Sequence, residues 1–233
     1  MKLTTIRVLF LRQVKDTIKN KATLIQFLLL PIMTAIMTMS ITLDDIAPDF
    51  FVKMFGSMYL GMAPLVTMSS ILAEEKEQNT LRMLLFSNVK ASEYLLGIGG
   101  YVFLCCTLGS FVIGCFGGYT ASQLFVFMCF SVAGILISIL IGAFIGVQSR
   151  NQMEATSLTL PLMMVFSFIP MLSTFNDTIA KIGEYTFTQQ INLMFDSLSF
   201  DMITAKSMLV IGITFCLAML VFALAYRKKH TIL

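Results

Sequence analysis

The chain has 233 residues, of which 57% are hydrophobic and 12% are charged, and its formal net charge is +3. Because soluble domains average about 25% charged residues, this composition excludes an ordinary soluble enzyme or binding domain. The basic residues flank apolar segments, as in membrane proteins, and do not form a surface for nucleic acid. The sequence therefore predicts a membrane protein with no nucleic acid among its partners.

The first predicted element is an amphipathic helix over residues 1–21, ahead of the first membrane span. Its apolar residues recur at helical spacing and form one face, made of Leu3, Ile6, Phe10, Val14 and Ile18. A basic helix of this kind lies in the cytoplasmic membrane interface with its cations toward lipid phosphates. The candidate interface residues are Arg7, Arg12, Lys15 and Lys19. Two roles stay open, a charged anchor that sets topology and an elbow helix that contacts a partner.

Six uncharged, apolar windows are long enough to cross a membrane, which takes roughly 20 apolar residues each. They lie at about 22–43, 54–73, 95–117, 122–147, 155–175 and 207–226. Backbone groups in lipid must be hydrogen-bonded within the protein, and the windows lack the alternation of barrel strands, so they are predicted as helices. The expected fold is an all-α polytopic membrane protein in which residues 22–233 form one six-helix domain.

The lysines and arginines of the connections predict the orientation. With the N-terminus inside, thirteen basic residues lie on the cytoplasmic side, and only Lys53, Lys181 and Lys206 lie outside. An even number of spans places both termini on one side. We therefore expect a multi-pass protein of the cell membrane with both termini in the cytoplasm.

A charged stretch at residues 74–94 separates the second span from the third. We expect a helix beginning near Glu74, because carboxylates in a first turn interact favourably with the positive end of the helix dipole. Its leucines would face the bundle, and Gln78 and Arg82 would lie on the opposite side. The prediction is a cytoplasmic helical hairpin that rests on the membrane. An ordinary solvated loop is the alternative.

The connection before the last span, residues 176–205, is the longest of the outside segments. Within it, four apolar residues share one helical stripe: Ile191, Met194, Phe195 and Leu198. We expect one or two short helices that re-enter the outer leaflet. A surface loop lying on the membrane is the alternative.

Enzymes that act within membranes are not supported by the residues present. The sole histidine, His230, lies in the C-terminal tail, so the H-E-x-x-H pattern and a Ser–His pair within the membrane are both missing. The five cysteines lie in predicted spans, and no pair has zinc-ligand spacing. A G-x-x-x-x-G-K-[ST] phosphate-binding loop is also missing. We therefore expect a non-enzymatic subunit that binds no metal and no cofactor of its own.

A channel or an ion-coupled secondary carrier is the alternative function. Such proteins usually hold ionisable groups at the middle of the membrane, where burying a charge is costly and tolerated only for function. The predicted spans contain none in their interiors. Glu154 lies at the cytoplasmic start of the fifth span, where it either caps the helix or belongs to a transport gate.

The stretch EEKEQNTLRMLLFSNVKASEYLLG resembles the segment that ABC-2 type transporter permeases carry between their second and third membrane helices. The family pattern is E-K-E-x-G-T-L-E-x-L-L-x-S-P, followed by a Glu and L-L-G. The matching residues are Glu75, Lys76, Glu77, Thr80, Leu81, Leu84, Leu85, Ser87, Glu93, Leu95, Leu96 and Gly97. The departures are Asn79 for Gly, Arg82 for an acidic or polar residue, Asn88 for Pro and Ile98 for Lys.

This resemblance implies that residues 74–90 form a coupling helix that docks on a separate ATP-binding subunit. The implied docking residues are Glu74, Glu75, Lys76, Glu77, Thr80, Leu81, Arg82, Leu84 and Leu85. ATP and Mg would then be held by the partner subunit. A second permease subunit is expected as well, and we expect a second copy of this chain in preference to a homologue. The expected function is export of a hydrophobic or amphipathic substrate, above all peptides such as bacterial peptide toxins or antimicrobial peptides, with lipids or hydrophobic drugs as the alternative.

Overall fold

The computed structural model describes residues 3–41, 47–78, 91–199 and 204–230. Within these ranges the chain forms nine helices and no strand. The helices are α1 (Leu3–Lys19), α2 (Lys21–Ser40), α3 (Phe50–Glu77), α5 (Ala91–Cys115), α6 (Ala121–Gln148), α7 (Gln152–Ser173), α8 (Asp177–Gly183), α9 (Phe187–Ser197) and α10 (Ala205–His230). Six of them, α2, α3, α5, α6, α7 and α10, are long and apolar enough to cross a membrane. The predicted all-α polytopic fold is confirmed.

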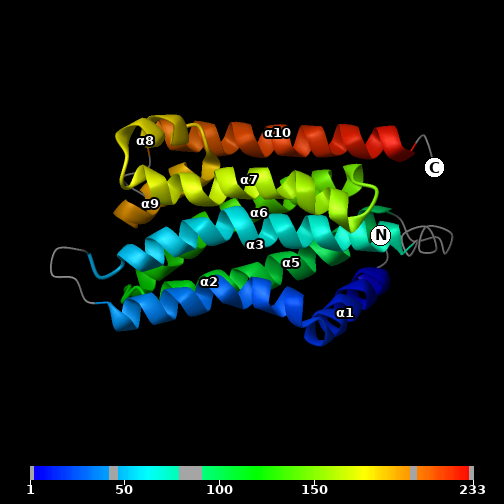
Figure 1. Ribbon diagram of the computed structural model, residues 1–233, viewed down its shortest axis with the longest axis horizontal. Helices are drawn as coiled ribbons and strands as arrows, with labels where there is room; N and C mark the ends of the chain where they lie inside the picture. The colour runs from blue at the N-terminus through cyan, green and yellow to red at the C-terminus, as the bar shows by residue number, and fades with distance from the viewer. Residues whose placement is uncertain (1–2, 42–46, 79–90, 200–203, 231–233) are drawn as a thin grey trace.

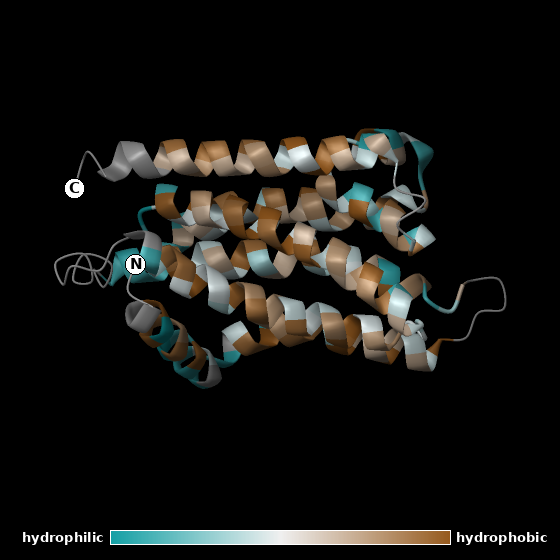
Figure 2. Cartoon of the chain, turned by 180° about the vertical axis from the view of Figure 1, so that it is seen from behind, coloured by the Kyte–Doolittle hydropathy of each residue, from teal (hydrophilic) through white to brown (hydrophobic). Residues whose placement is uncertain are grey.

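The six long helices lie side by side along the longest axis of the molecule (Figure 1). Helix α1 lies at one end of this bundle, at an angle to the other helices, and α10 ends at the same end, which we call the α1 end. Helices α8 and α9 lie at the opposite end, which we call the α9 end. Hydrophilic residues gather at the two ends, and hydrophobic residues dominate the length between them (Figure 2). This is the distribution of a protein that crosses a membrane along its helix axes.

Helix α3 is the centre of the bundle, in contact with α2, α5, α6, α7 and α9, and most of its residues are buried. Its approach to α6 depends on glycine. A Cβ added at Gly142 would lie 2.4 Å from the Leu65 carbonyl oxygen, and one added at Gly146 would lie 2.6 Å from the Leu72 Cβ. The two helices therefore pack at backbone distance along their second halves.

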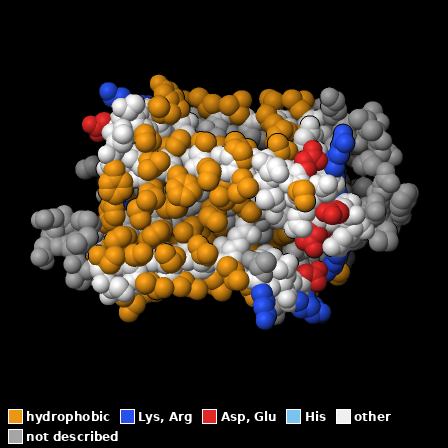
Figure 3. Space-filling view, viewed as in Figure 1, with side chains coloured by type: hydrophobic (Ala, Val, Ile, Leu, Met, Phe, Trp, Pro, Cys, Tyr) orange, Lys and Arg blue, Asp and Glu red, His pale blue; other side chains and the backbone are white. Residues whose placement is uncertain are grey.

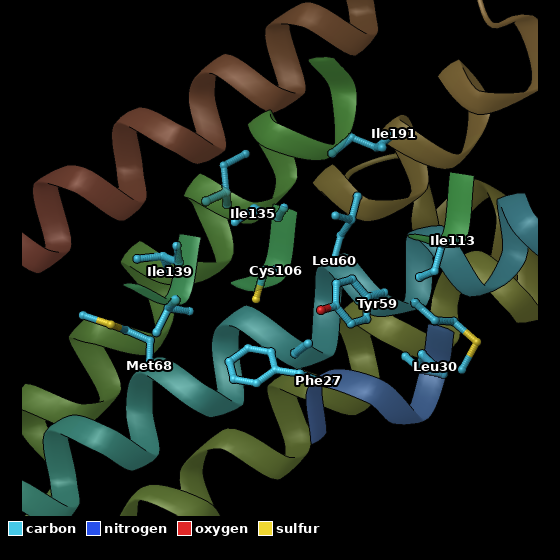
Figure 4. Packing of buried hydrophobic residues seen from close by; sticks show 14 of the residues in the cluster. Phe27, Leu30, Tyr59, Leu60, Met68, Cys106, Ile113, Ile135, Ile139 and Ile191 are labelled. Carbon is cyan, nitrogen blue, oxygen red and sulfur yellow. The ribbon is translucent and has the colours of Figure 1, made fainter. Parts of the chain in front are cut away.

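Polar side chains within the bundle bind α3 to its neighbours. Hydrogen bonds join Ser138 to the Leu60 carbonyl (2.6 Å), Ser167 to the Met58 carbonyl (3.1 Å), and Ser69 to the Thr159 hydroxyl (3.0 Å). Around these bonds, Tyr59 and Leu60 pack among buried apolar side chains of α2, α5, α6 and α9 (Figure 4). In an apolar environment such pairs satisfy polar groups that would otherwise be costly to bury, so they fix how α6 and α7 sit on α3.

The segment between α7 and α10 contains two short helices, α8 and α9, as predicted; their re-entry into the outer leaflet stays a prediction. The predicted stripe of Ile191, Met194, Phe195 and Leu198 is buried, and α9 packs against α3, α6, α7 and α10. Thr186 begins α9, and its side chain accepts a hydrogen bond from the Gln189 backbone N–H. The segment therefore packs against the bundle at its α9 end.

Helix α10 is the most exposed of the long helices. Of residues 205–225, Ser207 alone is buried, and within the described chain α10 packs mainly against α6 and α9. Its exposed large side chains include Leu209, Leu217 and Leu224. In a membrane these side chains contact lipid or another apolar surface without cost, because lipid tails are as apolar as leucine.

The structure corrects the predicted start of the charged segment. Helix α3 runs without interruption from Phe50 to Glu77, so the acidic cluster forms its last turn and not the first turn of a new helix. Carboxylates at a helix C-terminus face the negative end of the dipole, which is unfavourable unless neighbouring groups compensate. The remainder of the predicted coupling helix, residues 79–90, lies outside the described residues.

The predicted N-terminal amphipathic helix corresponds to α1, but its buried face is rotated from the predicted one. Leu9 and Thr17 are buried, while Phe10 and Val14 are only half-buried. The reason is that α1 packs against α5, where Gly97 lets Leu9 approach the α5 backbone closely. A pattern of apolar residues cannot report such a contact when polar Thr17 is part of it.

Candidate functional site

Charged side chains gather at the α1 end of the molecule, whereas hydrophobic side chains cover most of the remaining face (Figure 3). Four of these charged residues, Glu74–Glu77, form the last turn of α3. Three of the four, Glu75, Lys76 and Glu77, contact other helices. We call this group of contacts the α3 junction.

Lys76 joins the last turn of α3 to the end of α6. Its Nζ lies 2.8 Å from the Val147 carbonyl oxygen and 3.4 Å from that of Gly146, and it also donates to the Ser149 carbonyl. The last carbonyls of a helix lack partners within the helix and carry the negative end of its dipole. A half-buried ammonium at this point therefore neutralises the end of α6 and holds it against α3.

Glu77 joins the same turn to the beginning of α7. Its Oε2 accepts a hydrogen bond of 3.0 Å from the backbone N–H of Gln152, the first residue of α7. A carboxylate at a helix N-terminus satisfies one of the free N–H groups and faces the positive end of the dipole. The charge that is unfavourable at the end of α3 is thus placed favourably at the start of α7.

Glu154 lies in the first turn of α7 and satisfies backbone groups there. Its Oε2 accepts a 2.7 Å hydrogen bond from the Arg150 N–H, while the Asn151 side chain accepts one of 2.8 Å from the Glu154 N–H. Asn151 is therefore the N-cap of α7, and Glu154 supports the turn between α6 and α7. These contacts account for Glu154 structurally; a role in a gate stays a prediction.

Glu75 joins α3 to α1 and α5. The residue is 6% exposed, and its Oε1 lies 3.7 Å from Nη1 of Arg12 on α1. Arg12 also pairs with Asp16, with 3.5 Å between Nε and Oδ2, and the buried Tyr94 of α5 lies beside the Glu75 carboxylate. A buried carboxylate requires such partners, so removing Arg12 would leave a buried charge unpaired.

Tyr101 of α5 fixes the position of α1. Its hydroxyl donates a hydrogen bond of 2.5 Å to the Thr17 hydroxyl, and its ring packs edge-to-face against Phe10 with centroids 6.0 Å apart. Helix α1 is therefore attached to the bundle by a buried hydrogen bond, an aromatic contact and the Arg12–Glu75 ion pair.

The α9 end has an ion-pair group of its own. Lys53 Nζ lies 2.9 Å from Asp49 Oδ2 and 3.6 Å from Asp196 Oδ1, which connects the start of α3 to the end of α9. Burial raises the pKa of the Asp196 carboxyl above its ordinary value, and the neighbouring Lys53 ammonium opposes this rise. Helix α3 is thus held by charged contacts at both of its ends.

The predicted docking residues fall into two groups. Glu75, Lys76 and Glu77 contact other helices. Glu74 instead accepts a hydrogen bond of 3.2 Å from the side chain of Gln78, one turn further along the chain. The other predicted docking residues, Thr80, Leu81, Arg82, Leu84 and Leu85, lie outside the described residues. On α1, Arg7, Lys15 and Lys19 are exposed and Arg12 is paired.

The sequence did not predict which groups form hydrogen bonds with the charged residues of the α3 junction. The acceptors of Lys76 are backbone carbonyls at the end of α6, and the donor to Glu77 is a backbone N–H. Backbone groups occur in every residue and carry no signal in the sequence. Tyr94 and Tyr101 could have been suspected, because polar rings near a span end need partners when buried.

A family model for "ABC-2 family transporter protein" matches residues 10–227, from α1 to the last turn of α10. The chain belongs to the ABC-2 transporter family. No curated protein matches the sequence. Family membership indicates that this ABC-2 chain is the membrane subunit of an ABC transporter and implies that it pairs with an ATPase subunit.

Proposed function

We propose that this ABC-2 chain is the permease subunit of an exporter in which a separate ATPase drives the membrane helices through the end of α3. The observation that carries the proposal is the α3 junction, where consecutive residues Glu75, Lys76 and Glu77 contact α1, α6 and α7. A partner that moves the segment following Glu77 would move all of these helices together. In this proposal residues 74–90 are the coupling segment, and the partner holds ATP and Mg.

The packing of α3 favours the transmission of a displacement from one end of the helix to the other. The helix is buried over most of its length, and glycines bring its backbone into contact with α6. Close-packed interiors transmit displacement because they have few voids to absorb it. A push at the α1 end would therefore reach the α9 end, where Lys53 connects α3 to α9.

In this proposal the α1 end and both termini lie in the cytoplasm. This end of the described chain carries Arg7, Arg12, Lys15 and Lys19 on α1, and Lys76 on α3. Positively charged connections are retained in the cytoplasm. The ATPase also needs cytoplasmic nucleotide, so the coupling segment and the motor would lie on the same side of the cell membrane.

The proposed substrate is an amphipathic peptide carried outward, with a lipid or hydrophobic drug as the second class. Every Asp, Glu, Lys and Arg within the six long helices lies within four residues of a helix end. A pathway without mid-membrane charges is suited to apolar and amphipathic cargo, and it disfavours an ion-coupled carrier or a channel.

A second copy of this chain would complete the pathway, since one bundle of six spans leaves the apolar faces of α2 and α10 uncovered.

The test uses the chain reconstituted with its ATPase in proteoliposomes. Leu84→Asp changes the segment beyond α3, and we expect it to prevent co-purification of the ATPase. Lys76→Met and Glu77→Gln remove contacts of the α3 junction and leave residues 78–90 unchanged. We therefore expect the ATPase to bind but to hydrolyse ATP without proportionate transport, with coupling reduced about three- to tenfold, in line with the loss of one or two hydrogen bonds.

Lys206→Met is the matched control for Lys76→Met, because Lys206 pairs with Glu184 at the α9 end. We expect this variant to couple hydrolysis to transport normally. Full coupling in Lys76→Met and Glu77→Gln, with transport equal to that of the unmodified complex, would contradict the role of the junction. Transport driven by an ion gradient without nucleotide would favour the carrier instead.

A further inference from the structure

The α1 end also contains a cleft between α1, α2 and α3, with a volume of about 910 Å³. One face of α3 lines it, with Thr67, Ile71, Glu74, Glu75 and Gln78 at helical spacing. The residues that α1 and α2 contribute to the cleft are polar or charged. Pockets that hold small ligands measure about 300–1,000 Å³, so the cleft has the size of a binding site.

Three buried polar atoms of residues that line this cleft lack a hydrogen-bond partner in the described part of the chain, one each in Thr67, Gln26 and Glu75, where the atom is Oε2. The Thr67 side chain on α3 is 1% exposed, and its hydroxyl has no partner. The side-chain nitrogen of Gln26 on α2 is likewise buried and unpaired. Leaving such groups unsatisfied is costly, so native structures rarely do so without a reason. A ligand that enters the cleft would supply these missing partners.

Three acidic and three basic side chains line the cleft, and of these six only Glu75 is buried. Glu75 is 6% exposed there, and its guanidinium partner Arg12 is shared with Asp16. The two lysines of the cleft, Lys19 and Lys21, are exposed, so their charges are screened by water. A ligand with an ammonium or guanidinium group would therefore gain a charge-assisted hydrogen bond inside the cleft.

The spacing of these groups indicates an extended ligand. Thr67 and Glu75 are eight positions apart on α3, which at 1.5 Å per residue is about 12 Å. A fully extended peptide covers this distance with about four residues, at roughly 3.3 Å each. Its backbone offers carbonyl oxygens to the Gln26 amide nitrogen and both donors and acceptors to the Thr67 hydroxyl. A single amine headgroup could not reach all three groups.

An apolar groove adjoins the cleft at Lys21, which lines both. This groove on α2 has a volume of about 510 Å³ and is lined by residues including Leu24, Ile25 and Leu28. Apolar side chains of a ligand would be buried there while its polar groups lie in the cleft. The combined surface is therefore amphipathic.

We propose that the cleft binds a segment of a cationic amphipathic peptide, with a positive group at Glu75 and backbone groups at Gln26 and Thr67. The inference rests on the proposed export function, for which it names the substrate class and the loading site. Binding itself requires neither ATP hydrolysis nor the ATPase, so the two proposals can fail separately.

The experiment measures binding of a fluorescent synthetic peptide of lysine and leucine to the full chain in phosphatidylcholine nanodiscs without nucleotide. Fluorescence anisotropy gives the Kd. We expect Thr67→Val and Gln26→Leu each to weaken binding about three- to tenfold, and Glu75→Gln to weaken it tenfold or more. Thr67→Ser retains the hydroxyl and should bind like the unmodified chain, which separates lost binding from lost folding.

Matched controls lie at the α9 end, where Thr188 and Gln189 are also buried with an unpaired side-chain oxygen each. Thr188→Val and Gln189→Leu should leave the Kd unchanged. Equal binding by Thr67→Val and Gln26→Leu would overturn the proposal, as would equal affinity for a peptide of glutamate and leucine. Displacement of the probe by phosphatidylethanolamine but not by unlabelled peptide would identify a lipid site and also overturn it. Peptide binding without ATP-driven transport would count against the proposed function alone.

Discussion

Lys76 Nζ on α3 lies 2.8 Å from the carbonyl oxygen of Val147 on α6, so the end of one central helix is bound by charge to the end of another. We expect Lys76→Met to lower the free energy of unfolding by about 1–2 kcal/mol, because the last carbonyls of α6 lose their cation. For a chain of this size the thermal midpoint should fall by roughly 2–8 °C. Thermal unfolding in detergent measures the effect. Lys206→Met removes a more exposed pair and should change the midpoint by less; an equal fall in both variants would contradict the prediction.

Gly142 should not tolerate a larger residue. In Gly142→Ala the new Cβ would meet the Leu65 carbonyl oxygen at 2.4 Å, and a backbone atom cannot move aside as a flexible side chain can. We expect a loss of about 1–3 kcal/mol through overpacking. Gly212→Ala in α10 is the control, since nothing lies within 4 Å of a Cβ at that position. It should be neutral or slightly stabilising, because alanine favours helix. Parallel melting curves for the two variants test this difference directly.

Tyr101 should control the attachment of α1. Tyr101→Phe keeps the ring against Phe10 and removes the hydroxyl that binds Thr17, so we expect a cost of about 0.5–1.5 kcal/mol confined to α1. Hydrogen exchange should speed up in α1 by about two- to tenfold and remain unchanged in α7. Tyr185→Phe, at a residue that is 76% exposed, should have no effect. Unchanged exchange in α1 would show that other contacts hold this helix.

The proposed orientation can be measured by labelling. The five native cysteines, which are free thiols, are first replaced by alanine or serine. Single cysteines are then introduced by Lys181→Cys in α8 and Lys15→Cys in α1. We expect a membrane-impermeant maleimide to label the first in intact cells and the second only after permeabilisation. The reverse pattern would place the α1 end outside and remove the basis for cytoplasmic coupling.

Six spans and a charged segment between the second and third could be predicted from sequence, because they depend on local properties. A run of apolar residues is costly to expose to water, and a helix is the way to satisfy its backbone in lipid. The stripe through Ile191 and Phe195 was equally readable, since periodicity records which side of a helix is buried. The sequence by itself therefore determined the six spans, the buried stripe of the segment between α7 and α10, and the family resemblance.

Only the tertiary structure decided what the charged residues contact. Glu77 was expected at the start of a helix, and it lies at the end of α3 with its carboxylate at the start of α7. Lys76 binds carbonyls of residues about 70 positions away. The same is true of the cleft, in which Thr67 and Gln26 come from different helices. Such contacts depend on how helices are rotated and paired, and that choice is made by packing over the whole bundle, which no local pattern records.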